Sequence, residues 1–232
     1  MKRIVIAALL ITSVLVPAVV TGLSSARADV GAVSLPASLT IAEPTVRFSG
    51  TVRVGSTTTG LRSASIWFRY PDATEATRIG TATSRRPGFL VVTASLDATR
   101  VVPGLNRVQV KDDADGDSRT ITLDLRRRSR VTITHAEFRS SGRVALEVKV
   151  WHYDPKLGRF APSKLSPVRL QEKVAGSWVP IAQVTTDATG LARALLQAGP
   201  GLHDYRAIRP NGATVLTATS KTIRTGQTVA AR

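Results

Sequence analysis

Short runs in which apolar and polar residues alternate recur along most of the chain, and this alternation restricts the fold more than any other feature of the sequence. The clearest run lies between Arg143 and Trp151, where every second residue is apolar: Val144, Leu146, Val148 and Val150. A period of two places these side chains on one face of a β-strand, whereas a helix requires a period of 3.6 residues. Strands with one apolar face are typical of antiparallel sheets. The sequence therefore predicts an all-β antiparallel protein.

Turn residues divide the alternating runs into about seven strands in each half of the chain, a spacing typical of an immunoglobulin-like sandwich. The basic run Arg126–Arg130 separates the halves, because charges this dense cannot enter an apolar core. We expect two tandem immunoglobulin-like antiparallel β-sandwiches after an N-terminal signal segment. Their predicted bounds are 1–28 for the signal, 29–125 for the first domain, 126–130 for the junction and 131–232 for the second domain.

Three hairpins are expected from the turn residues between successive runs. The first joins 107–110 to 120–125, the second joins 183–186 to 191–195, and the third joins 205–208 to 214–218. Gly190 ends the second turn, where a left-handed backbone conformation favours glycine.

Several segments of the second half occur in a characteristic order: 166–171, 176–178, 185–190 and 205–207. This part of the chain, over about residues 131–224, resembles the bacterial immunoglobulin-like modules of secreted actinobacterial proteins, whereas residues 33–125 resemble them only in outline. The resemblance implies the sandwich fold and adhesion or spacing roles, and it implies no catalytic residues. Independently of the resemblance, Tyr205 follows Gly201 and begins a strand, so we interpret it as structural, with its hydroxyl bracing the neighbouring corner.

The N-terminus has the layout of a secretory signal. Lys2 and Arg3 precede an almost wholly apolar stretch over residues 4–20, and Ala26-Arg27-Ala28 matches the small-residue pattern of signal peptidase. Cleavage after Ala28 would release a secreted protein. The alternative is an uncleaved anchor, since the apolar stretch is close to the length that spans a bilayer. The membrane is therefore expected as a partner only through an uncleaved signal.

The sequence contains no cysteine. An exported chain without disulfides must be stabilised by its own apolar cores, and it offers neither a thiol nucleophile nor a thiolate metal ligand. It also lacks a G-x-S-x-G nucleophile elbow, an H-E-x-x-H zinc motif and a phosphate-binding loop. We therefore expect a protein that is not an enzyme and has no resident cofactor.

Positive charge is concentrated in the second half of the chain. Residues 29–125 contain 11 basic and 10 acidic side chains, whereas residues 126–232 contain 18 basic and 6 acidic ones. Such an excess favours anionic partners, and outside a bacterium these are envelope polymers or an acidic surface protein. The candidate contacts are Arg126, Arg127, Arg128 and Arg130. A solvated surface rich in arginine for genomic reasons is the alternative interpretation, and no module that reads nucleic-acid bases is visible.

Asp113, Asp115 and Asp117 have the 1, 3 and 5 spacing of a calcium-binding loop. Ser118 stands where that loop needs glycine, and the flanking residues predict strands in place of helices. An ordinary Asp/Gly hairpin turn is therefore the competing interpretation, with weak calcium binding as the alternative.

Trp151, His152 and Tyr153 form an aromatic cluster at the end of the clearest strand. The rings of Trp151 and Tyr153 are candidates for stacking on a sugar, and alternation places Trp151 on the face opposite Val150. The alternative is that one ring closes the end of the core. The expected function is an exported structural or adhesive protein that associates with the anionic cell envelope. The alternatives are a carbohydrate-binding module and an extracellular ligand-sequestering or inhibitor protein.

Overall fold

The structure, a computed structural model, describes residues 30–54, 63–86, 89–113, 116, 118–139 and 141–226. The predicted signal 1–28 with its cleavage site at Ala28, and two of the candidate calcium ligands, Asp115 and Asp117, lie outside these residues. The described residues form strands and no helix, so the all-β prediction is confirmed.

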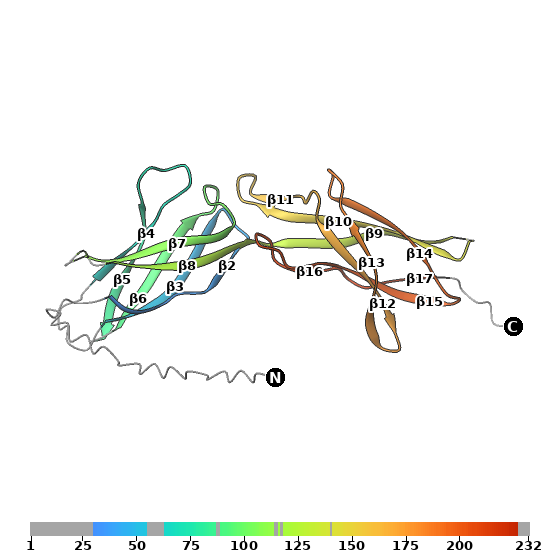
Figure 1. Cartoon of the computed structure of the whole chain (residues 1–232), viewed down its shortest axis with the longest axis horizontal. Coiled ribbons are helices and arrows are strands. Elements are labelled where there is room, and N and C mark those ends of the chain that lie inside the picture. The colour runs from blue at the N-terminus through green and yellow to red at the C-terminus, as the bar shows by residue number, and fades with distance from the viewer. Residues whose placement is uncertain are drawn as a thin grey trace, which may run out of the picture.

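Eight strands of the first domain form one sheet in the order β1-β3-β6-β5-β4-β7-β8-β2 (Figure 1). The edge strand β1 contacts β7 and β8, and the other edge strand β2 contacts β3, so the sheet curls into a sandwich. All pairs are antiparallel except β2 with β8. The strands are β1 (Val30–Ser34), β2 (Ser38–Ile41), β3 (Thr45–Val54), β4 (Ser63–Phe68), β5 (Thr77–Arg86), β6 (Phe89–Asp97), β7 (Gly104–Asp112) and β8 (Ser118–Arg127).

Nine strands of the second domain form two separate sheets. In one, β10 pairs with β9 on one side and with β14 and β11 on the other. In the other, the order is β13-β12-β15, and β16 and β17 both pair with β15. This division of the strands is the immunoglobulin-like order. The strands are β9 (Ser129–Arg139), β10 (Arg143–Asp154), β11 (Arg159–Pro162), β12 (Pro167–Val174), β13 (Ser177–Thr185), β14 (Leu191–Gln197), β15 (Leu202–Arg209), β16 (Ala218–Thr219) and β17 (Ile223–Gly226).

Alternation predicts the core of the second domain correctly. Leu146 in β10 and Leu170 in β12 are both fully buried, and they come from opposite sheets. Burying a leucine side chain contributes about 1.5–3 kcal/mol, so these rows of apolar side chains provide the cohesion that disulfides supply in many small extracellular domains. Tyr205 in β15 is also buried, but its hydroxyl has no hydrogen-bond partner among the described residues. Burial, with Glu172 adding to it, raises the pKa of Tyr205 to about 12. Tyr205 is thus structural, as predicted, but it braces no corner through its hydroxyl.

The hairpin predictions have three different outcomes. The β7–β8 hairpin is confirmed. The hairpin between 183–186 and 191–195 is wrong, because β13 pairs with β12 and β14 pairs with β10. Its turn does form, since Asp187 Oδ1 accepts hydrogen bonds from the Thr189 and Leu191 N–H groups at 2.7 and 3.1 Å. The local turn signal was correct, but it does not decide which sheet each flanking strand joins. The third hairpin is shorter than predicted, since β15 pairs with β16 only at Ile208 and Arg209.

Candidate functional site

The basic run predicted as a loose junction is almost entirely strand. β8 ends at Arg127 and β9 begins at Ser129, so only Arg128 lies between them. The Arg127 N–H donates to Thr214 O at 2.9 Å, and the Leu216 N–H donates to Arg127 O at 3.0 Å. The Arg128 N–H donates to Ile41 O of the first domain at 3.0 Å. The backbone of this segment is therefore held from both domains.

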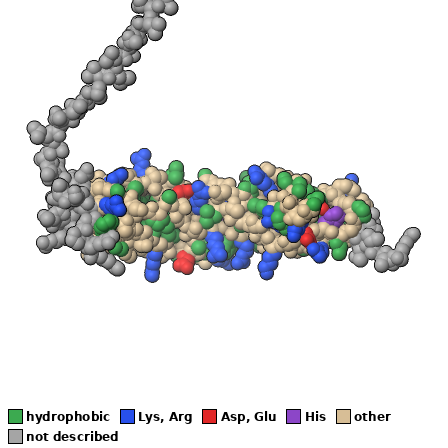
Figure 2. All heavy atoms as spheres, turned by 90° about the horizontal axis from the view of Figure 1, so that it is seen from below, with side chains coloured by type: hydrophobic (Ala, Val, Ile, Leu, Met, Phe, Trp, Pro, Cys, Tyr) green, Lys and Arg blue, Asp and Glu red, His purple; other side chains and the backbone are tan. Residues whose placement is uncertain are grey.

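The four arginines predicted to act together have four different environments. Arg126 is half-buried, and its Nη2 lies 2.6 Å from Asp124 Oδ2. Arg127 is also half-buried, Arg128 is exposed, and exposed Arg130 places its guanidinium 5.1 Å from the Phe160 ring centroid. Only Arg128 and Arg130 are therefore open to a large partner. Figure 2 shows how widely Lys and Arg side chains are spread along one face of the molecule, with few Asp or Glu between them.

Tyr153 does not form the exposed sugar platform that the sequence suggested. It is 6% exposed, and although it belongs to the second domain it packs into the core of the first. Its ring meets Phe160 edge to face with centroids 5.8 Å apart, and its N–H donates to Arg128 O at 2.8 Å. Trp151 is half-buried, with Lys149 Nζ 5.6 Å from its ring centroid. Tyr153 instead follows the alternative interpretation, in which a ring packs into a core, although nothing in the local sequence indicated that this core belongs to the other domain.

The acidic turn provides Asp113 with partners from the protein itself. Asp113 Oδ2 lies 4.0 Å from Arg78 Nη2. A hydrogen bond to Ser65, and further ones to Ser63 and charge from Arg78, hold the pKa of Asp113 below its usual value against an opposing effect of burial. Within the described ranges no group of three metal-ligating side chains comes together. Calcium binding stays a prediction, since Asp115 and Asp117 are not described.

The charges of Arg127 and Arg209 act on His152 beside the junction, and no sequence pattern indicated this combination. Arg209 of β15 is 8% exposed, and its Nη1 donates to Pro210 O at 2.6 Å and Val215 O at 3.2 Å. Val215 also forms a bridge with Arg127. Burial lowers the pKa of His152, and the charges of Arg127 and Arg209 lower it further, while Asp154 opposes them. A single sequence cannot place Arg209 beside Val215, because this contact depends on how the 210–217 loop folds back.

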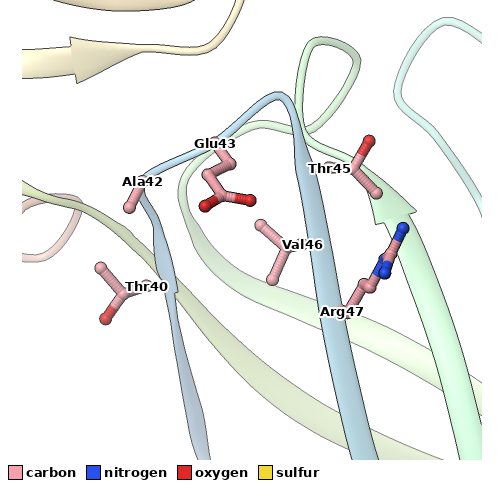
Figure 3. Close-up of a pocket in the computed structure, with 6 residues that line it drawn as sticks. All are labelled: Thr40, Ala42, Glu43, Thr45, Val46 and Arg47. Atoms are coloured by element: carbon pink, nitrogen blue, oxygen red, sulfur yellow. The ribbon is translucent and has the colours of Figure 1, made fainter.

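The surface of the molecule also has hollows, and charged side chains line them. One of about 460 Å³ lies at the turn between β2 and β3, and Glu43, Val46 and Arg47 are among the residues that line it (Figure 3). A second of about 540 Å³ lies between the open edges of the two sheets of the second domain, along β9 and the β16–β17 segment. Arg130 and Lys221 both line this second hollow, so two cations border a groove.

No protein-family model and no curated protein matches the chain. Among solved structures, the chain is similar to bovine butyrophilin at 12% identity, over 84% of this chain and 95% of that one, with a TM-score of 0.44. It is similar to Parabacteroides merdae beta-glucuronidase at 9% identity over 84% of this chain, spanning 24% of that protein, with a TM-score of 0.27. Both scores are low, and the assignment of the fold rests on the strand order. The residues described contain no helix of the length and apolarity needed to cross a membrane.

Replacing Tyr153 with alanine should lower the free energy of unfolding by about 3 kcal/mol, because the change leaves a cavity in the first core. Chemical denaturation followed by tryptophan fluorescence measures the effect. Leu157→Ala in the turn that follows β10 is the control, since Leu157 is 55% exposed and should change stability by less than about 0.5 kcal/mol. Equal effects of the two substitutions would contradict the placement of Tyr153.

The lowered pKa of His152 predicts a loss of stability in acid. The unfolded histidine titrates near about pH 6.5, so below that pH the unfolded state binds more protons than the folded state. The stability that neutral His152 contributes is fully present above that pH. It is lost as the pH falls towards the pKa of His152 in the folded state. Urea unfolding across this range should therefore show a smaller decline for His152→Gln than for the wild type. His135→Gln serves as a control at an exposed histidine, and a parallel decline in wild type and His152→Gln would contradict the prediction.

Proposed function

We propose that this chain is an exported, non-enzymatic structural or adhesive protein that associates with the anionic cell envelope through its basic second domain. The observation that carries the proposal is the charge of residues 126–232, with 18 basic and 6 acidic side chains. Long-range attraction of this kind speeds encounter and adds affinity without demanding a specific sequence or shape in the partner.

Acidic side chains of the second domain form ion pairs within that domain. The excess positive charge therefore remains available to a partner in solution. Glu147 lies 2.8 Å from Arg193 Nε, and Asp204 lies 2.6 Å from Arg224 Nε. Glu172 forms an ion pair with His203. Because these acids face their own partners, they do little to shield the remaining cations from an approaching polyanion.

The groove along β9 is the surface that best suits an extended anionic polymer. The groove runs between two open sheet edges, and Arg130 and Lys221 place positive charge along it. Arg128 is exposed close by, immediately before β9. A chain of phosphate or carboxylate groups lying in this groove would meet these cations in succession, as the proposal requires.

Binding to purified anionic envelope polymer should weaken steeply as salt rises, because added ions replace the counterions that binding releases. Co-sedimentation at increasing sodium chloride measures it. Arg130→Gln with Lys221→Gln should reduce the bound fraction and flatten the salt dependence. Arg193→Gln with Arg224→Gln removes the same formal charge from cations already paired with acids, and this control should bind more nearly as the wild type does. Retention that is independent of salt, or no retention at low salt, would contradict the proposal.

A further inference from the structure

Two arginines at the domain junction carry buried nitrogen atoms that the protein leaves without partners. The Nε–H groups of Arg127 and Arg209 are both buried, and neither donates a hydrogen bond to an acceptor among the described residues. Burying an ionised group without a compensating partner is costly, so a guanidinium in this state is normally matched by an anion. Two such groups beside one another make the cost larger.

The chain brings both arginines to the same short segment. Arg127 forms a parallel bridge with Val215, and Arg209 Nη1 donates to Val215 O at 3.2 Å. Ser129 lies opposite His152 in the β9–β10 register, and its hydroxyl donates to Leu216 O at 2.5 Å. Residues 214–216 thus contact Arg127 and Arg209 directly, and Ser129 links them to β10, the strand that carries His152.

The local acids offset this positive charge only in part, since burial and Arg127 still lower the pKa of His152 against the opposing effect of Asp154. Asp154 is the carboxylate whose charge acts on His152, and its Oδ1 accepts hydrogen bonds from the Lys156 and Leu157 N–H groups at 2.9 and 3.4 Å. Asp124 pairs with Arg126. The positive charges of Arg127 and Arg209 therefore act on His152 together, consistent with one shared positive centre.

We propose that Arg127, Arg209 and His152 form a binding site for a small tetrahedral oxyanion, phosphate or sulfate, at the junction between the two domains. Guanidinium groups match the geometry of such oxyanions, and an imidazole adds a further N–H donor. Arg209 is 8% exposed, so a bulky polymer cannot reach its guanidinium. The site is independent of envelope association, which uses the exposed cations of the groove.

Inorganic phosphate titrated into the full chain at constant ionic strength tests the site. The resonances of the His152 ring should shift with saturation, and the melting temperature should rise more with phosphate or sulfate than with chloride. In Arg127→Met the affinity for phosphate should fall by about tenfold or more, which is the loss expected for one charge-assisted hydrogen bond. Arg127→Met is chosen because the junction hydrogen bonds to Thr214 and Leu216 come from the backbone of Arg127, which the substitution keeps.

Arg128→Met is the matched control, since it removes the same charge from the adjacent exposed residue. It should leave both the phosphate affinity and the His152 shift close to wild type. Unfolding in phosphate-free buffer shows whether each variant keeps its fold. The absence of a saturable shift in the wild type would overturn the site, and so would equal phosphate affinities of Arg127→Met and Arg128→Met. The Arg130/Lys221 double variant should still bind phosphate, so failure of polymer binding is distinguishable from failure of this site.

Discussion

The hydrogen bonds made by the Arg127–Arg128 backbone are the interaction on which the arrangement of the molecule depends. Through them β8 passes into β9 with a single intervening residue, and the segment receives bonds from Ile41 on one side and from residues 214–216 on the other. A strand held in this way cannot turn freely about its own axis. The placement of Tyr153 in the first core follows directly, because its N–H is bound to Arg128 O.

Because of this geometry, the arginines of the basic run 126–130 do not form one continuous surface. A sequence of arginines suggests one solvated, adhesive patch, yet alternation along a strand sends neighbouring side chains to different surroundings. Arg126 is engaged by Asp124, Arg127 turns towards the buried junction, and Arg128 and Arg130 face solution. The positive charge therefore divides into an exposed part suited to a polyanion and a buried part suited to a small ion.

The sequence predicted the fold class and the apolar face of β10, because alternation and turn residues are local signals. It did not predict that β13 and β14 join different sheets, since Asp187 and Gly190 specify a turn and not its partners. Arg209 was missed, and the packing of Tyr153 into a core was only the alternative interpretation, for a related reason. Their burial depends on a second domain and on a returning loop, and neither leaves a local pattern in the residues around them.

A rigid junction is the central claim, and the absence of cysteine makes it directly measurable. Spin labels attached to Thr93→Cys in the first domain and Val179→Cys in the second report the distance between the domains, and both positions are exposed. Pulsed dipolar spectroscopy on this double variant should give one narrow distance distribution. A broad distribution that extends over many separations would contradict the account, because it would mean that the two sandwiches reorient about Arg128.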